Sequence, residues 1–509
     1  MDINSFPNEV LCRVFDFLVW SDRKRVSLVC RRWNGIINSD RYLRQAKLIL
    51  YNYSKVQFFS GVEVGLLNTQ RNIEFHSSAM LDTDELLMTV AEAFPSGDAV
   101  AECVDLFLRS DHEQLFSSVI LSLPNLHQLK SLSILANEGF KTFTNGLEIK
   151  NENVQKLKLT FYQNTNCRLI TPKLTTLNLV IRYPSDINLL NSISHQLKDL
   201  TVNFQSKDLV AKLFFCNFEK LARLHLSIAN DKYLPYMVTP SAVSNWNDIK
   251  QFTESIKTLK VLEIVDKCNM LRHTYLKVFV YAESLTHLTV NYIILDSTIL
   301  EFISNFKQLQ YLNLVGCSTV GEPVLLDLPN LRELLMPYKH YSTLPCINLS
   351  HLTTLSYSSS QKNHAQFVQQ ITKTFTNLKT LNLLNFDYEL SPTCFQFLDQ
   401  LKHLTSLTIS DMSVSNQLFT NCPTLPTLQK LKLWTVVTEI SLLEHLSNKL
   451  PNLYKLNIDN CFFYIVSDST SQLTFNELRK KLSRCRISTL DTTVFTNEQY
   501  DQNPIYIPG

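Results

Sequence analysis

A leucine pattern recurs along most of the chain, and it constrains the fold more than any other feature. The pattern is L-x-x-L-x-L with aliphatic or aromatic substitutions. Its spacing ranges from 20 residues (Leu157 to Leu177) to 26 residues (Leu262 to Leu288), with one gap of 38 from Leu224 to Leu262. The central leucines are Leu132, Leu157, Leu177, Leu200, Leu224, Leu262, Leu288, Leu312, Leu334, Leu355, Leu381, Leu407, Leu431 and Leu456. A fixed period of this length indicates a repeat architecture.

Each repeat is predicted to be one strand followed by a helix. Two weaker units around Ile73 and Leu106 extend the series toward the amino terminus, and helix-like stretches such as 86–94 and 298–306 lie between strands. Each unit exposes an apolar face that only its neighbour can cover, so stacking predicts a curved α/β solenoid with parallel strands on the concave face and helices on the convex face. A coiled coil would need heptads, whereas Pro and Asn interrupt these apolar runs.

Residues 70–490 resemble the leucine-rich repeat family, in the longer, helix-bearing form of its intracellular members. The family places Asn or Cys three residues beyond the last leucine, and this chain does so at Asn137, Cys317 and Cys461. We therefore expect a leucine-rich-repeat solenoid at 51–490 and a carboxy-terminal tail at 491–509.

Residues 6–37 predict two amphipathic helices. The first runs from about residue 7 to 18, since Pro7 presets φ for a first turn and apolar residues follow at helical spacing: Val10, Leu11, Val14, Phe15 and Leu18. The second begins at Asp22, a capping residue, and carries apolar residues on one side: Val26, Val29, Cys30, Trp33 and Ile37. A module of about 45 residues cannot cover all these side chains itself, so part of the apolar face must contact something else.

The order of these residues resembles an F-box. The matching positions are Phe6-Pro7, Glu9-Val10-Leu11, Val14-Phe15, Leu18, Asp22 and Ser27-Leu28-Val29-Cys30-Arg31-Arg32-Trp33. Family members bind the small Skp adaptor, which docks on a cullin scaffold. The resemblance implies that residues 1–50 bind this adaptor, through Phe6, Pro7, Val10, Leu11, Val14, Phe15, Leu18, Leu28, Val29, Cys30 and Trp33. The alternative is an amino-terminal cap of the solenoid.

The outward positions of the strands are the candidate substrate surface. Side chains alternate along a strand, so the third, fifth and seventh residues of each pattern face the concave side. Early rows are basic (Lys156, Lys158, Arg223, His225), and middle rows are apolar between Glu263 and Glu333 (Val261, Val265, Tyr311, Val315, Leu335, Pro337). Late rows are basic again. We expect substrate contacts at Tyr311, Leu335, Lys430, Lys432, Trp434 and Lys455.

Trp434 and Lys432 are the first choice for an acidic or phosphorylated segment, because they combine stacking area with positive charge. The alternative is that these side chains are ordinary surface. The middle of the 38-residue gap, residues 231–246, places Tyr233, Tyr236, Met237 and Trp246 near Pro235 and Pro240. It is either a binding lip or a packed excursion.

The sequence contains no motif that is typical of a catalytic or metal-binding site. Phosphate loops, nucleophile elbows and zinc-spaced cysteines are missing from the sequence, and His225, His287 and His351 have no partner at metal-ligand spacing. We therefore expect no catalytic residue, no metal and no cofactor. A net charge of +2 points to neither nucleic acid nor a membrane.

The sequence also predicts the compartment. The first residues lack the pattern of a secretory signal, and no run of about 18 apolar residues could span a bilayer. The twelve cysteines include no C-x-x-C pair, which is typical of a reducing environment. We expect a cytoplasmic or nuclear protein.

The two resemblances together imply the substrate-recognition subunit of a Skp–cullin–F-box ubiquitin ligase, with no catalysis of its own. Two alternatives stay open. One is a scaffold that binds the adaptor independently of any ligase, and the other is an enzyme whose site is hidden among the repeats.

Overall fold

The computed structural model describes part of the chain as two compact units. Unit 1 is Met1–Leu224 with Asp231–Ser255, and unit 2 is His225–Asn230 with Ile256–Gly509. The described residues are 6–18, 20–37, 47–51, 72–76, 102–108, 120–121, 123–136, 146–162, 164, 166–205, 207–228, 250–267, 278–319, 326–336, 346–349, 351–359, 364–386, 390, 392–415, 417–465, 478, 480–490 and 492–496. The predicted helix 86–94, segment 231–242, Trp246, Asn137 and Pro337 lie outside them.

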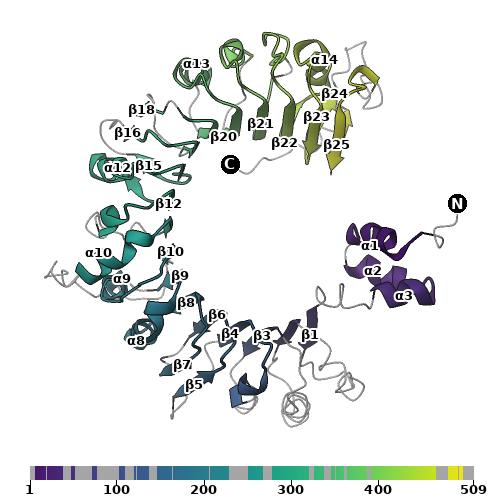
Figure 1. Ribbon diagram of the computed structural model, residues 1–509. Helices are drawn as coiled ribbons and strands as arrows, with labels where there is room; N and C mark the ends of the chain where they lie inside the picture. The colour runs from purple at the N-terminus through teal and green to yellow at the C-terminus, as the bar shows by residue number, and fades with distance from the viewer. Residues whose placement is uncertain are drawn as a thin grey trace. The chain divides into compact units, whose positions relative to one another are not determined.

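The described part of the amino-terminal module contains three helices (Figure 1): α1 (Asn8–Asp16), α2 (Trp20–Ser27) and α3 (Arg31–Ile37). The prediction of one helix from Asp22 onward was wrong. The backbone N–H of Leu28 donates to Arg25 O and that of Val29 to Val26 O, each at 3.1 Å, so α2 closes in a tight turn. Helix α3 then begins at Arg31, and the Sγ of the preceding Cys30 accepts from Trp33 N at 3.4 Å, in the manner of an N-cap.

The apolar spacing alone did not reveal this break, because the turn keeps Val26, Cys30 and Trp33 packed on one core. Asp22 lies in the first turn of α2 and does not precede it. There it pairs with Arg25, with 3.5 Å between Oδ1 and Nη1.

The remainder of unit 1 is built on parallel strands that pair in chain order. The series is β1 (Lys47–Tyr51), β2 (Asn72–His76), β3 (Cys103–Leu108), β4 (Ser131–Ala136), β6 (Lys156–Phe161), β8 (Thr176–Ile181) and β9 (Asp199–Phe204). A second short pair, β5 (Leu147–Lys150) with β7 (Cys167–Ile170), accompanies it. Helices α8 (Pro184–Ile193) and α9 (Lys207–Leu213) lie between strands in sequence.

Unit 2 repeats the same arrangement. Its strands pair in the series β11 (Val261–Asp266), β12 (His287–Asn291), β14 (Tyr311–Asn313), β17 (Glu333–Leu335), β19 (Thr354–Ser359), β20 (Thr380–Phe386), β21 (Ser406–Ser413), β22 (Lys430–Glu439), β23 (Lys455–Asp459) and β25 (Arg486–Leu490). Within unit 2, α12 (Ser297–Ser304) and α13 (His364–Thr374) lie on the same side of the strands, and among the described residues of this unit no helix lies on the opposite side (Figure 1). The predicted helix 298–306 corresponds to α12.

The repeat series continues past residue 490. Strand β24 (Phe462–Ile465) pairs with β22 and with β26 (Thr493–Thr496). The pairing therefore enters the segment expected to be a tail. The strand β10 (Arg223–Ile228) lies at the boundary between the two units.

The predicted central leucines form the core of both units. In unit 1, Leu132, Leu157, Leu177 and Leu200 are register partners on successive strands. In unit 2 an equivalent line runs from Leu262 to Leu456. All of them are buried, and each contributes about 1.5–3 kcal/mol relative to an exposed side chain. The leucine-rich-repeat solenoid predicted from the sequence is confirmed.

A hydrogen-bond ladder joins consecutive repeats at the start of many of the strands. One carbonyl oxygen accepts the N–H groups of two consecutive residues of the next repeat. Lys130 O, for example, accepts from Gln155 N at 2.8 Å and from Lys156 N at 2.9 Å. The same arrangement recurs in unit 2, where Thr405 O accepts from Gln429 N and Lys430 N, both at 2.9 Å. These bonds keep the strands in register with the leucine line.

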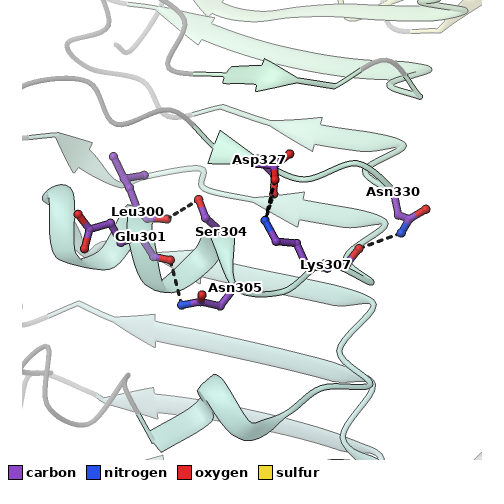
Figure 2. Close-up of polar contacts among 7 residues, drawn as sticks. All are labelled: Leu300, Glu301, Ser304, Asn305, Lys307, Asp327 and Asn330. Atoms are coloured by element: carbon purple, nitrogen blue, oxygen red, sulfur yellow. Dashed lines mark hydrogen bonds and ion pairs between the residues drawn. The ribbon is translucent and has the colours of Figure 1, made fainter.

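Side chains add further links between neighbouring repeats. Figure 2 shows Asn330, whose Nδ2 donates to Lys307 O at 2.9 Å, and Lys307, whose Nζ contacts Asp327 Oδ2 at 2.8 Å. Asn153 and Asn452 bond a carbonyl of the preceding repeat in the same way. The family's Asn or Cys position is represented by Cys317, whose Sγ donates to Val290 O at 3.0 Å.

Asn151 is the most completely bonded of these amides. It is buried, and its Nδ2 donates to Leu123 O at 2.6 Å and Leu126 O at 3.1 Å. Its Oδ1 accepts from Asn153 N at 2.8 Å and Val154 N at 3.1 Å.

We predict that Asn151→Ala lowers the free energy of unfolding by about 2–4 kcal/mol, since it leaves several buried backbone groups without partners. The control Asn153→Ala removes a partly exposed amide two residues away and costs about 1 kcal/mol or less. Urea unfolding of the full chain, followed by circular dichroism, measures both. Equal transitions for the two variants would contradict this role of Asn151.

Candidate functional site

The amino-terminal helices have a small core of their own. Leu11, Phe15, Trp33, Ile36 and Ile37 are buried together. The rings of Phe15 and Trp33 meet edge to face, with centroids 5.3 Å apart and planes at 65°. Three residues expected to contact an adaptor, Leu11, Phe15 and Trp33, therefore support the module from within.

Two arginines hold the helices of the module together. Arg23 is buried, and its Nε donates to Phe15 O at 2.9 Å, which caps the carboxyl end of α1. Arg32 Nη2 donates to Phe6 O at 2.6 Å, and its Nε donates to Asn8 Oδ1 at 2.9 Å. These cations thus have structural partners within the module.

The same module leaves large apolar side chains in solvent. Leu28 is 85% exposed and Val29 is 61% exposed, both in the turn between α2 and α3. Val10 and Val14 are exposed on α1, and Pro7 is exposed before it. The remaining predicted contacts, Phe6, Leu18 and Cys30, are half-buried against the core.

Phe17 is an exposed residue that the sequence reasoning missed. It follows α1 and is 90% exposed. Phe17 lies seven residues after Val10 and three after Val14, which is helical spacing, so the spacing that located these two valines could also have located Phe17. We call Val10, Val14, Phe17, Leu28 and Val29 the apolar surface set. Exposed large apolar side chains gathered on one small module mark an interaction site.

A family comparison agrees with this geometry. Residues 3–47 match the family model described as F-box-like. The amino-terminal module is an F-box-like domain. Domains of this kind bind Skp-type adaptors in general.

Two further comparisons concern the whole chain. No curated protein matches it. Among solved structures, it is similar to an internalin from Listeria monocytogenes, with 14% sequence identity and a TM-score of 0.32 over 59% of this chain and 75% of that chain. The repeat assignment here rests on strand pairing and leucine register.

The predicted substrate residues all lie on strands of unit 2. Lys430, Lys432 and Trp434 are alternate residues of β22, and Lys455 begins β23 as the register partner of Lys430. Lys430, Lys455 and Trp434 are exposed, and Lys432 Nζ lies 5.2 Å from the centre of the Trp434 ring. The structure therefore brings these four residues together.

Tyr311 and Leu335 lie elsewhere in unit 2, on β14 and β17, and both are half-buried. Tyr311 stacks on His287, with ring centroids 5.7 Å apart. Burial raises the pKa of Tyr311, its hydrogen bond with Asn313 opposes this, and the nearby carboxylates of Glu333 and Glu263 raise it further. Val261 and Val265 are half-buried and Val315 is exposed, so the middle rows combine these aliphatic side chains with an aromatic pair beside acidic side chains.

The early rows are less basic than the sequence implied. Arg223 pairs with Asp199, with 3.7 Å between Nη1 and Oδ2. In unit 2, His225 Nδ1 lies 2.7 Å from Glu263 Oε2. Lys156 and Lys158 are exposed on β6.

The described residues can also be compared with the requirements of metal sites, membrane-spanning helices and reactive thiols. They contain no group of three or more His, Cys, Asp or Glu side chains placed to hold a metal ion. In the same part of the chain, no helix has the length and apolar character needed to cross a membrane. Burial raises the pKa of the Cys216 and Cys317 thiols to about 12, which keeps them protonated and unreactive at neutral pH.

Phe15 and Phe17 offer a matched test of which residues hold the module together. We predict that Phe15→Ala costs about 3–5 kcal/mol, because Phe15 is 1% exposed in the core. Phe17→Ala changes stability by about 0.5 kcal/mol or less. Hydrogen exchange of the α1 and α3 amides in the full chain measures both, and similar loss of protection in the two variants would contradict the assignment.

Proposed function

We propose that this protein is the substrate-recognition subunit of a Skp–cullin–F-box ubiquitin ligase. The observation that carries the proposal is the apolar surface set on an F-box-like domain with its own core. A separate core lets those side chains stay in solvent until a partner covers them. That partner is a Skp-type adaptor, and through it the cullin–RING core.

The repeats have the complementary role of holding a protein substrate. Along each parallel strand, alternate side chains point away from the leucine core. The ladder of hydrogen bonds fixes the spacing of those side chains from one repeat to the next. A fixed array presents the substrate to the conjugating enzyme at a defined distance, so the rate enhancement comes from proximity. No side chain of this chain takes part in the chemistry. The reaction belongs to the cytoplasm or nucleus, where buried free thiols such as Cys216 and Cys317 stay reduced.

The main alternative is a scaffold that binds the adaptor without any ligase. The F-box-like domain binds the adaptor in both candidate functions. The proteins that bind together with the adaptor therefore decide between the ligase subunit and the scaffold. Affinity purification of the tagged full chain followed by mass spectrometry is the discriminating experiment. The adaptor together with a cullin supports the ligase subunit, whereas the adaptor alone supports the scaffold.

The adaptor contact itself is testable with surface variants. We predict that Leu28→Ala with Val29→Ala weakens binding of a purified Skp-type adaptor by about tenfold or more, because buried apolar anchors dominate such interfaces. Phe17→Ala also weakens binding of the adaptor. Titration calorimetry on the full chain measures the affinity.

Leu121→Ala is the control, because Leu121 is exposed in unit 1 outside the F-box-like domain. It leaves adaptor affinity and the melting temperature unchanged. If the Leu28 and Val29 variant binds the adaptor as tightly as this control does, the contact surface is assigned wrongly.

A further inference from the structure

Three cations stand side by side at the beginning of the last strands of unit 2. Lys430 on β22 is the register partner of Lys455 on β23, and Lys455 is the register partner of Arg486 on β25. We call these three residues the cationic row. Neighbouring strands lie about 4.8 Å apart, so the row extends over about 10 Å. All three side chains are exposed.

No ion pair among the described residues compensates the positive charge of this row. Among the described ion pairs, none includes a residue of the row. Two residues further along the same strands lie Lys432, Asn457 and Ser488. Lys432 adds one more positive charge. Like charges directly opposite each other on neighbouring strands are destabilising. A row of this kind is therefore suited to an anionic ligand.

Two aromatic rings accompany the cations. Lys432 Nζ lies 5.2 Å from the centre of the Trp434 ring, and Lys430 Nζ lies 6.0 Å from the centre of the Tyr454 ring. Both rings are exposed. Cation–π contacts at this range hold the ammonium groups without neutralising them. The rings also provide flat apolar area beside the charges.

The arrangement of the cations and of the backbone N–H groups indicates which kind of anion fits the row. The backbone N–H groups of the row are already used, since Lys430 N and Lys455 N bond carbonyls of the preceding repeats and Arg486 N donates to Tyr454 O. No cradle of N–H groups is left for a phosphate. The row places one cation on each of three successive strands, with neighbouring strands about 4.8 Å apart, which matches several separate carboxylates.

A carboxylate further along the strands also limits how far an anionic ligand can extend in that direction. Asp459 is the register partner of Trp434 and places a negative charge two positions beyond Asn457. A long polyanion running along the strands would meet this carboxylate. A peptide crossing the strands would not. In a polyproline II segment, which has three residues per turn and rises about 3.1 Å per residue, side chains i and i+3 lie on the same side about 9 Å apart, which is close to the length of the row.

We propose that the cationic row binds an extended acidic segment of the protein substrate, with Asp or Glu side chains at i and i+3. This inference rests on the proposed function, because it names the segment that the substrate receptor recognises. Lys430, Lys455 and Arg486 contact the carboxylates, Lys432 adds charge, and Trp434 and Tyr454 pack against the peptide beside them. Arg486 was not among the residues predicted from the sequence.

The probe is a short fluorescein-labelled Gly/Ser peptide with Glu at every third position, titrated with the full chain and followed by anisotropy. The triple variant Lys430→Ala, Lys455→Ala, Arg486→Ala weakens binding by about tenfold or more, the sum of three exposed charge contacts. The control Lys156→Ala with Lys158→Ala removes two exposed strand lysines of unit 1 and changes the affinity by about twofold or less. About 1 M salt abolishes binding to the wild type.

Several outcomes would overturn the proposal. They are absence of binding, equal binding of a peptide with Gln in place of Glu, and equal loss in the triple variant and the control. Tighter binding of the same peptide with phosphoserine would assign the row to phosphate, and tighter binding of oligouridine would assign it to nucleic acid. Adaptor affinity of the triple variant is measured in parallel. A wild-type chain that binds the adaptor but not the peptide removes this inference alone, whereas a wild-type chain that binds the peptide but not the adaptor removes the proposed function.

Discussion

No repeat of this chain can cover its own apolar face, and the whole structure depends on that constraint. A strand with one leucine line and a short helical segment is too small to form a core. Burial comes only when Leu132 lies against Leu157, or Leu312 against Leu334, at matched register. The ladder of paired N–H donors, as at Lys130 O, supplies that register. Because a one-residue slip would turn every leucine toward solvent, register and core stabilise each other.

The amino-terminal helices solve a different problem. Phe15, Trp33 and their neighbours form a core that needs no repeat to cover it, and Arg23 closes the end of α1. This separation allows Leu28 and Phe17 to remain in solvent without exposing the core itself. A protein with this division can lose a partner contact and keep its fold. The functional proposal depends on that independence.

The sequence predicted the repeat fold well, because register partners such as Leu157 and Leu177 recur at a fixed interval and each strand alternates. It predicted the presence of the helical module but not the break at Cys30, since apolar spacing is the same for a continuous helix and for two helices packed on one core. It also could not separate Leu11, which is buried, from Leu28, which is exposed. Both match the F-box pattern, and only the packing distinguishes them.

For the strand surface, the sequence identified the cations on β22 and β23 but not Arg486. The segment before β25 lacks the leucine pattern that located the other strands, so the third member of the row had no register in the sequence. Conversely, Arg223 and His225 counted as basic positions until the structure placed Asp199 and Glu263 beside them. Charge partners on other strands depend on pairing, which a single sequence does not specify.

We propose that the F-box-like domain receives an adaptor on its exposed apolar side chains while the repeats stay available for another protein. The most direct measurement is hydrogen exchange of the full chain with and without a saturating purified Skp-type adaptor. We predict slower exchange in α1 and in the turn formed by Leu28 and Val29, with no change in the strands β19 to β25. Unchanged exchange in the amino-terminal helices, or protection of the repeat strands instead, would contradict the account.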